Sequence, residues 1–326
     1  MLKKSLAFFI LGLMLICSCS KTNEQPKPAE PKPAPKSSEH SITDVTAYIM
    51  GFSQCTFEDP WRMNMNKEME AAAHAHRGVR LIISNGDNRN AKQVADIENY
   101  LVMGVQVLIV SPREAAPLTP AVEKAYDSGI PVIVLDRKIG SDKYSVFIGA
   151  SNLEIGREAG KYMVQKLGGK GNIVEIEGIL GATPTQERSS GFHEVVDKEP
   201  GIKVVYKQPG DYKRSPARQV MENALSAHDK IDAVYAHNDE MMIGAYLAAK
   251  AAGREKNMVF VGIDGQKEAV NMIRQGILSA TFVYPNGAKE AIDLALKILR
   301  GEQVDKQIQL STTRVTKDEA KDYVGF

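Results

Sequence analysis

Short apolar runs alternate with longer segments of helical period along the chain from Val45 onward. Continuous runs rich in Val and Ile are typical of strands buried on both faces, and helices must then cover both faces of the sheet. The alternation therefore predicts βαβ units and parallel sheets, which is an α/β fold. The first set of predicted strands covers Val45 to Met50, Val79 to Ile83, Val105 to Val110, Ile130 to Leu135 and Tyr144 to Ile148, with helices over Pro60 to Arg77, Ala91 to Met103 and Leu118 to Ser128.

A second set with the same pattern follows in the next part of the chain. Its predicted strands cover Asn172 to Ile176, Lys203 to Gln208, Ala233 to Ala236, Met258 to Ile263 and Ala280 to Tyr284, with helices over Leu153 to Leu167, Pro184 to Asp197, Ser215 to Ala227, Glu240 to Ala252 and Lys267 to Gln275. The chain is thus predicted to fold as two similar doubly wound units. A helix over Gly287 to Arg300 and a strand over Gln307 to Thr313 do not extend the second unit, and we expect them to return to the first.

The N-terminus has the pattern of an export signal. Lys3 and Lys4 precede an apolar run from Leu6 to Ile16, which is well short of the ~20 residues that span a bilayer. The run leads into Ile16-Cys17-Ser18-Cys19, which resembles a bacterial lipobox, and the small Ser18 makes Cys19 the better candidate for lipidation. We therefore predict a lipoprotein signal peptide over residues 1–18 and a membrane-anchored location in the periplasm or at the cell surface. Cleavage without lipid is the alternative.

Residues 19–44 are predicted to form a tether. The stretch from Lys21 to Ser41 is rich in Pro, Lys and Glu and has few large apolar side chains, so it cannot bury enough surface to fold. Its Pro-Lys-Pro repeats favour an extended polyproline geometry that would hold the folded part away from a membrane. After processing, Cys55 is the one thiol left in the folded part, so no internal disulfide is expected.

Length and charge limit the classes of function. With 326 residues, of which 43% are hydrophobic, the chain is long enough for two cores. Lys and Arg number 41 and Asp and Glu number 40, so the net charge of +1 gives no attraction to nucleic acid or to an anionic membrane. The sequence has no nucleophile elbow, paired cysteine cluster or His/Glu zinc spacing, and Gly168 to Gly171 follows a predicted helix, whereas a phosphate loop precedes one. We therefore expect neither catalysis nor a bound cofactor or metal.

Polar side chains follow the predicted strands in both units. In open α/β sheets, ligands bind at the carboxyl ends of the strands. The pairs Ser53-Gln54, Asp136-Arg137 and Asn238-Asp239 and the single residues Asp211 and Asp264 each come after an apolar run. An Arg fork can bridge two sugar oxygens, and a carboxylate can accept hydrogen bonds from neighbouring hydroxyls. These positions predict one crevice that binds a small, hydroxyl-rich ligand.

Each of these positions has a structural alternative. Asp136-Arg137 could form a surface ion pair, and Asn238-Asp239 could cap a helix. In Trp61-Arg62, the only tryptophan either packs in a core or stacks on the apolar face of a sugar while the arginine reaches ring oxygens. Asp264 is compatible with a turn, and Arg188 with a solvated position on a helix.

The chain contains a set of motifs that is specific when taken together. The motifs are Gly51-Phe52-Ser53-Gln54, Trp61-Arg62, Leu135-Asp136-Arg137, Gly181-Ala182, Arg188, Gly191-Phe192, Gly210-Asp211, Arg214-Ser215, Tyr235-Ala236-His237-Asn238-Asp239, Ile263-Asp264-Gly265 and Pro285-Asn286. Over Val45 to Phe326 they closely resemble the type I solute-binding proteins of sugar ABC transporters, in the pentose/hexose branch that includes the periplasmic galactofuranose-binding protein. The loop from Cys55 to Pro60 departs from the pattern, because Cys55, Phe57 and Glu58-Asp59 stand where small polar residues are expected.

The resemblance implies two Rossmann-like lobes joined by three hinge crossings, near Ala150, Tyr284 and Ser311, with the sugar in the cleft between the lobes. It assigns residues 45–150 and 285–310 to an N-terminal lobe and residues 151–284 and 311–326 to a C-terminal lobe. The ligand contacts that it implies are Ser53, Gln54, Trp61, Arg62, Asp136, Arg137, Arg188, Asp211, Asn238 and Asp264.

The resemblance also implies how the protein functions. A monosaccharide, a galactofuranose-like hexose or a pentose, would close the lobes of a monomer, and the permease of an ABC importer with its ATPase would contact the closed form directly. A sugar-sensing module that presents its ligand to a chemoreceptor or sensor kinase is the alternative, because the binding chemistry is the same. A sugar-responsive repressor shares the fold but would carry a helix-turn-helix where this chain has an export signal and a tether.

Overall fold

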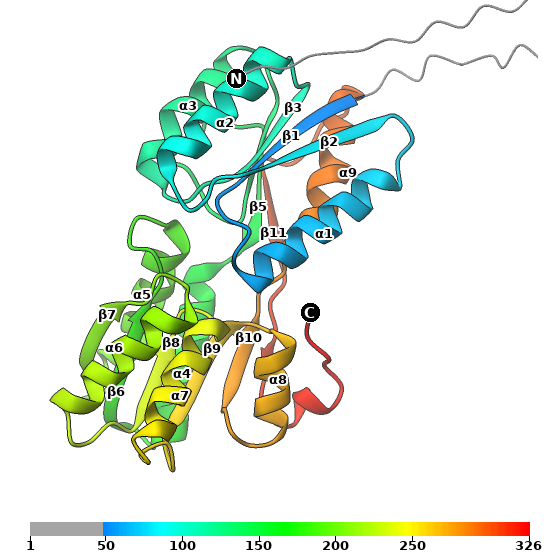
Figure 1. Cartoon of the computed structure of the whole chain (residues 1–326). Helices are drawn as coiled ribbons and strands as arrows, with labels where there is room; N and C mark the ends of the chain where they lie inside the picture. The colour runs from blue at the N-terminus through cyan, green and yellow to red at the C-terminus, as the bar shows by residue number, and fades with distance from the viewer. Residues whose placement is uncertain (1–47) are drawn as a thin grey trace, which may run out of the picture. The chain divides into compact units, whose positions relative to one another are not determined.

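The computed structural model describes residues 48–326, which form two six-stranded sheets with helices on both faces of each (Figure 1). The predicted signal peptide, the tether and Cys19 lie outside the described residues. Within residues 48–326, no helix combines the length and the apolar character that a bilayer crossing requires. The predicted fold class, an α/β protein with two doubly wound parallel-sheet lobes, is confirmed.

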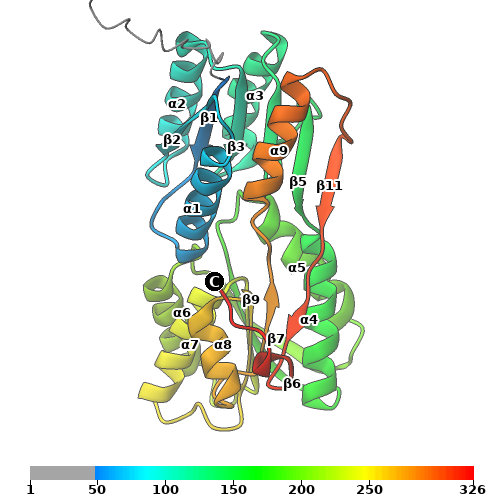
Figure 2. The same ribbon diagram turned by 90° about the vertical axis from the view of Figure 1, so that its right-hand side faces the viewer.

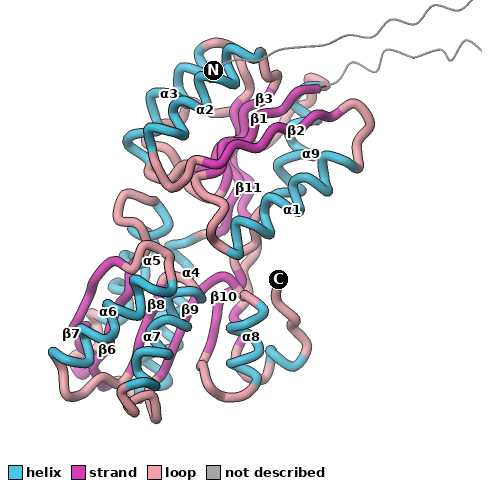
Figure 3. Tube along the Cα trace, viewed as in Figure 1, coloured by secondary structure: helices cyan, strands magenta, loops and turns pink. Residues whose placement is uncertain are grey.

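The first sheet, which we call sheet A, forms the upper group of magenta strands in Figure 3. All of its strands pair in parallel. Its elements are the strands β1 (Tyr48–Gln54), β2 (Val79–Asn85), β3 (Val107–Ser111), β4 (Val132–Leu135), β5 (Val146–Ala150) and β11 (Gln307–Leu310), in the order β11-β5-β4-β3-β1-β2, and the helices α1 (Pro60–His74), α2 (Asn90–Met103), α3 (Ala115–Asp127) and α9 (Ala288–Leu299). Successive side chains of a strand point to opposite faces. Val107 and Ile109 of β3 therefore pack in one cluster with α1 and α9, whereas Leu108 and Val110 pack in another with α2 and α3.

The second sheet, sheet B, is parallel except at one edge. Its elements are the strands β6 (Lys170–Glu177), β7 (Gly201–Pro209), β8 (Ala233–Ala236), β9 (Val259–Asp264), β10 (Ala280–Val283) and β12 (Arg314–Val315), in the order β12-β10-β9-β8-β6-β7, the helices α4 (Asn152–Leu167), α5 (Thr183–Val196), α6 (Arg214–Ala227), α7 (Asp239–Ala251) and α8 (Lys267–Arg274), and a short 3-10 helix, η1 (Glu319–Lys321). β12 pairs antiparallel with β10. Helices α4 and α5 cover one face of the sheet, and α6, α7 and α8 cover the other.

Helices α4 and α5 pack closely because each presents a glycine to the other. A Cβ at Gly156 of α4 would overlap the carbonyl oxygen of Arg188, and a Cβ at Gly191 of α5 would overlap the carbonyl oxygen of Leu153. This contact fixes α5, and Arg188 with it, against the helix that follows β5.

Within the described residues, the chain passes between the two sheets three times. It leaves sheet A after β5, returns to it after β10 and leaves it again after β11. Helix α9 packs on α1, and β11 pairs with β5 (Figure 2). Residues 288–310 thus complete sheet A and its helical layer, although they come late in the sequence.

Several predicted elements end at other residues than the pattern indicates. β1 pairs with both β2 and β3 up to Gln54, so Ser53 and Gln54 belong to the strand and do not follow it. Helix α1 ends at His74, and the chain then turns through Gly78, whose φ of +82° suits a glycine. β11 ends at Leu310, because the next residues lead across to β12 in sheet B.

Candidate functional site

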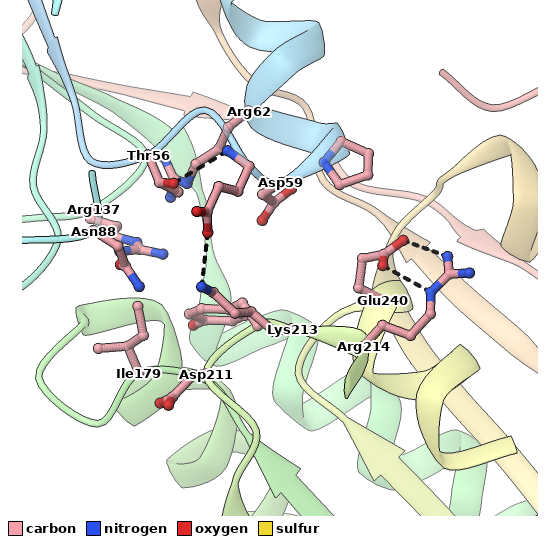
Figure 4. A pocket seen from close by; sticks show the side chains of 13 residues that line it. Thr56, Asp59, Arg62, Asn88, Arg137, Ile179, Asp211, Lys213, Arg214 and Glu240 are labelled. Atoms are coloured by element: carbon pink, nitrogen blue, oxygen red, sulfur yellow. Dashed lines mark hydrogen bonds and ion pairs between the residues drawn. The ribbon is translucent and has the colours of Figure 1, made fainter. Parts of the chain in front are cut away.

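A polar cleft lies between elements of sheet A and elements of sheet B. Its inner cavity is lined by Asp59, Trp61, Arg62, Asp136, Arg137, Pro184, Arg188, Tyr212, Asn238, Asp264 and Tyr284. A larger outer pocket adjoins it and shares Asp59, Arg62, Arg137 and Tyr212 (Figure 4). The structure thus brings seven of the ten predicted contacts together around the inner cavity: Trp61, Arg62, Asp136, Arg137, Arg188, Asn238 and Asp264.

Arg62 and Asp136 form a buried ion pair on the sheet A side of the inner cavity. Arg62 is in the first turn of α1, and Asp136 follows β4 with a φ of +66°. Arg62 Nη2 donates to Asp136 Oδ2 at 2.8 Å. Arg62 Nη1 donates to Gln54 Oε1 at 2.6 Å and to Ser111 Oγ at 3.0 Å. Burial alone would raise the pKa of Asp136, but Arg62 and Arg137 outweigh burial and hold this pKa below its usual value, so the carboxylate is ionised.

Arg137 extends from the same turn toward sheet B. Its Nη1 donates to the carbonyl oxygen of Arg113 at 2.9 Å, and its guanidinium carbon lies 5.2 Å from the centre of the Tyr212 ring. Tyr212 belongs to the turn after β7, so this cation–π contact joins side chains from the two sheets. Arg137 and Asp136 are each only 4% exposed, so the alternative of a solvated surface pair is wrong.

Arg188 lines the inner cavity from α5. Its Nε donates to Asn152 Oδ1 at 2.8 Å, and its Nη1 donates to the carbonyl oxygen of His237. Its guanidinium carbon lies 4.7 Å from the centre of the Tyr284 ring. The alternative of a solvated helix position is wrong, because Arg188 is buried. These contacts fix the orientation of the guanidinium group before any ligand arrives.

Trp61 packs in a core, as one of the two alternatives predicts, and also borders the inner cavity. It is buried in the core around α1, and its Nε1 donates to the carbonyl oxygen of Tyr284 at 2.7 Å. It also lines the inner cavity. Tyr284 directly follows β10, where the chain returns from sheet B to sheet A, so the indole connects α1 to this crossing.

The fluorescence of Trp61 should change when a sugar enters the inner cavity, because the sugar would replace water beside the indole. Since the chain has one tryptophan, the signal has a single source. Emission spectra recorded during titration with pentoses and hexoses measure the effect, and a Trp61→Phe variant supplies the baseline. A flat titration with a sugar that binds by calorimetry would contradict the contact.

Asn238 both caps a helix and lines the inner cavity. Its Oδ1 accepts the backbone N–H of Met241 at 2.9 Å, which caps α7. Its Nδ2 donates to the carbonyl oxygen of Tyr212 at 3.3 Å. The capping alternative is therefore confirmed, and the same side chain also borders the cavity.

Asp264 faces the inner cavity from the end of β9. Its φ of +129° lies in a region that side-chain-bearing residues rarely adopt. The buried Asp239 stabilises this turn, because its Oδ2 accepts the N–H groups of Gly265 and Gln266, each at 2.9 Å. Asp239 thus supports the site from behind and does not line the inner cavity. Burial, together with the carboxylate of Asp59, raises the pKa of Asp264 well above its usual value.

Three predicted contacts are absent from the lining of the inner cavity. Ser53 is buried behind the cleft, and its Oγ accepts from Gln93 Nε2 at 3.2 Å. Gln54 is buried as well and reaches the site only through Arg62. Asp211 borders the outer pocket, but its side chain is exposed and points away from the hollow (Figure 4). The turn after β7, in which Asp211 and Tyr212 both have positive φ, directs Tyr212 into the cleft instead.

Four residues of the inner cavity were not among the predicted contacts, namely Asp59, Pro184, Tyr212 and Tyr284. Tyr212 and Tyr284 follow strands, so the strand-end rule that marked Asp264 could have found them. Asp59 and Pro184 are at the beginnings of α1 and α5. The sequence carries no signal that these two helices begin at the same cavity.

Acidic and basic side chains are equal in number in the lining of the inner cavity. Three carboxylates and three guanidinium groups line it, from Asp59, Asp136 and Asp264 and from Arg62, Arg137 and Arg188. An ionic ligand would leave an uncompensated buried charge, which is costly. An uncharged ligand with many hydroxyls can instead donate to the carboxylates and accept from the guanidinium groups.

A second buried ionic network adjoins the cavity in sheet B. Glu175 of β6 is fully buried, and its carboxylate lies 2.8 Å from His193 Nε2, 3.1 Å from His237 Nε2 and 3.5 Å from Lys207 Nζ. Burial alone would raise the pKa of Glu175, but the hydrogen bonds with His193 and His237 outweigh burial and bring it below its usual range. The hydrogen bond with Glu175 in turn raises the pKa of His193 to about 8. Because the His237 carbonyl accepts from Arg188, this network supports the cavity wall.

Comparison with known proteins identifies the family. The family model of the periplasmic binding protein domain matches residues 50–303. The chain belongs to the periplasmic binding protein family. Ribose import binding protein RbsB of Bacillus subtilis (strain 168) is 34% identical over 310 residues, which cover 94% of this chain and 97% of that protein. Galactofuranose-binding protein YtfQ of Escherichia coli (strain K12) is 32% identical over 293 residues, which cover 86% of this chain and 92% of that protein.

A solved structure of this periplasmic binding protein family is also similar. The fructose-binding periplasmic domain of a hybrid two-component system is 45% identical, with a TM-score of 0.82 over 84% of this chain and 92% of that chain. The region matched by the periplasmic binding protein model contains every residue that lines the inner cavity. These relatives are named for the sugars that they bind, and family membership implies an extracytoplasmic location.

Proposed function

We propose that this protein is the solute-binding component of a sugar ABC importer and that it binds one monosaccharide in the inner cavity. The observation that supports this most directly is the set of three aspartate and three arginine side chains that both sheets contribute to the lining. A monosaccharide presents hydroxyls along its whole edge, so it can donate to Asp136 and Asp264 while it accepts from Arg137 and Arg188. No catalytic step is proposed.

The direct contacts that we propose are Trp61, Arg62, Asp136, Arg137, Arg188, Asn238 and Asp264. Ser53 and Gln54 would act indirectly, since Gln54 holds Arg62 and Ser53 holds Gln93. For the lobes we propose residues 45–150 with 285–310 and residues 151–284 with 311–326, so that the sugar binds between them.

The preferred sugar that we propose is a hexose in the five-membered ring form. Galactofuranose has such a ring, fructose adopts one in solution, and two of the relatives described above are named for these sugars. A wrong epimer would leave buried polar groups unpaired, at a cost of about 1–3 kcal/mol for each group.

Sugar binding would favour the closed arrangement of the lobes, because contacts from both sheets are complete only when the cleft is closed. Polar contacts around the cleft would add to this preference. Lys138 donates through its backbone N–H to Thr183 Oγ1 at 2.9 Å and through Nζ to Glu187 Oε1 at 2.6 Å, and Lys213 Nζ donates to Glu58 Oε2 at 2.8 Å. The exposed pairs among them stabilise the closed form only modestly.

A permease that works with an ATPase would bind the closed form directly. The protein would act as a monomer. Sugar sensing is the second candidate, because the 45% identical domain belongs to a hybrid two-component system. Permease and ATPase genes beside the gene of this protein would favour import. A neighbouring sensor kinase or chemoreceptor gene in their place would favour sensing.

Thermal unfolding of the purified protein with galactofuranose, D-fructose, D-galactose, D-ribose, arabinose and inositol tests the proposed binding function. A ligand that binds only the folded state raises the melting temperature in proportion to the logarithm of its concentration over Kd. We expect a concentration-dependent rise with at least one of the five-membered-ring sugars. No rise with any member of the panel would refute monosaccharide binding.

Lipid anchoring at Cys19 is a further part of the proposal, and it lies outside the described residues. Cys19→Ala should move the protein from the membrane fraction to the soluble fraction, because the acylated residue would be lost. Cell fractionation of the full-length chain measures the change, with Cys17→Ala as the control that should leave the partition unaltered. Unchanged membrane association of the Cys19→Ala protein would reject the anchor.

A further inference from the structure

We propose that Asp59 determines the charge specificity of the inner cavity, so that the site accepts an uncharged sugar and rejects the corresponding sugar acid. The inference rests on the proposed function, because it concerns the choice between two ligands of one cavity. Asp59 is in the loop from Cys55 to Pro60, where the sequence departs from the resemblance noted above, and it lines both the inner cavity and the outer pocket.

Asp59 has acceptor capacity left for a ligand. It caps α1, because its Oδ1 accepts the backbone N–H of Trp61 at 2.8 Å. An ionised carboxylate can accept about four hydrogen bonds, so the cap leaves room for ligand hydroxyls. Figure 4 shows that the Asp59 carboxylate points into the hollow, beside Arg62 and opposite the side chains of sheet B.

The charge of Asp59 decides the balance of the cavity. Arg62 and Asp136 neutralise each other in a direct ion pair of 2.8 Å. Two guanidinium groups, Arg137 and Arg188, then remain against two carboxylates, Asp59 and Asp264. Without the acidic side chain of Asp59, the arginines of the lining would outnumber its acidic side chains, which would suit a ligand that carries one carboxylate.

In the protein as it is, a sugar acid would meet two carboxylates in a buried site. Coulomb repulsion is several times stronger in such a site than in water, and the arginines are already engaged by Arg113, His237 and Asn152. Burial also raises the pKa of Asp59 against the influence of Arg62.

The chain offers a matched control in the preceding residue. Glu58 is exposed, pairs with Lys213 at 2.8 Å and lines the outer pocket but not the inner cavity. Glu58→Gln therefore removes the same charge one residue away. Asp59→Asn removes the charge of Asp59 but keeps the helix cap, because Asn caps helices as well as Asp does.

Calorimetric titrations at pH 7 test the proposal with D-fructose and D-fructuronate and with D-galactose and D-galacturonate. In the unaltered protein we expect binding of an uncharged sugar and at least about 100-fold weaker binding of its acid. Asp59→Asn should weaken the sugar about tenfold and strengthen the acid, so that the ratio of the two affinities falls at least 100-fold. Glu58→Gln removes only an exposed pair at the edge of the cleft, so it should change both affinities by the same small factor and leave their ratio unaltered.

The outcomes separate this inference from the proposed function. If the unaltered protein binds a sugar and folded Asp59→Asn keeps the same ratio of sugar to acid affinity, the inference is overturned and the proposed function stands. If Glu58→Gln shifts the ratio as much as Asp59→Asn does, the effect is one of general charge and the inference is again overturned. If the unaltered protein binds none of the four probes and none of the screened sugars, the proposed function is itself refuted, whatever the variants do. Equal melting temperatures of the empty variants would show that the cap is intact.

Discussion

Arg137→Ala should abolish sugar binding while the empty protein remains folded. The side chain is held by the Arg113 carbonyl at 2.9 Å and lies 5.2 Å from the Tyr212 ring of the other sheet, so its fork is fixed where a sugar would be bound. A hydrogen bond to a charged group contributes about 1.5–3 kcal/mol, and the loss of two such bonds weakens binding at least about 100-fold. The Arg62–Asp136 pair remains in the variant, which keeps the turn after β4 in place. Calorimetry with D-fructose measures the loss.

Two further variants sharpen this test. Arg89→Ala removes an exposed arginine from the same part of the chain, and we expect it to leave the affinity unchanged. Arg137→Lys keeps the charge without the planar fork, so it should restore only part of the affinity. Undiminished binding by Arg137→Ala would refute the assignment of Arg137 to the site.

Glu175→Ala should destabilise the folded protein by about 1–3 kcal/mol, because it leaves the buried Nε2 of His237 without a hydrogen-bond partner and removes the charged partner of His193. His193, His237 and Lys207 all lie within 3.5 Å of the Glu175 carboxylate. The matched control is Glu177→Ala in the same strand, since Glu177 pairs at 3.2 Å with a Lys207 side chain that is 37% exposed. That change should cost less than about 1 kcal/mol. Urea unfolding of both variants measures the difference.

The effect of Glu175 should depend on pH. Its pKa is lower in the folded protein than the usual 4.5, so the stability that it adds is present above about pH 4.5 and is lost as the pH falls through the folded pKa. The pKa of His193 rises from 6.5 to about 8 in the folded protein. The stability that His193 contributes is therefore fully present below pH 6.5 and is lost as the pH rises through about 8. Burial lowers the pKa of His237 below its usual value. The difference in the free energy of unfolding between the unaltered protein and Glu175→Ala should therefore be largest between about pH 4.5 and 6.5. A difference that does not depend on pH would contradict the network.

The sequence predicts most of the fold because both sheets are buried on both faces. Runs such as Val107 to Val110 and Ala233 to Ala236 are apolar throughout, and each lies in the predicted strand. The ends of elements are less predictable, because pairing partners decide them. β1 continues to Gln54 because Asn85 and Ser111 lie opposite that residue in the neighbouring strands, which no local pattern reveals.

The site is predictable as far as it depends on strand ends. Asp136 and Asn238 follow strands, Asp264 ends a strand, and all three line the inner cavity. The strand-end rule also predicted Asp211, which does not line the inner cavity. Positive φ values at Asp211 and Tyr212 expose the Asp211 carboxylate and bury the Tyr212 ring. The Glu175 network could not be predicted, because Glu175, His193 and His237 come from three elements whose contact depends on tertiary packing.

The late return of α9 and β11 to sheet A affects when the protein can fold. Until residues 288–310 leave the ribosome, β5 has no outer neighbour and α1 lacks the helix that packs on it. The parallel pairing of β11 with β5 joins segments that are about half the chain apart, and contacts between such distant segments form slowly. Nascent chains should consequently stay loosely structured during synthesis. A loosely structured chain can pass through a secretion channel before the native structure forms.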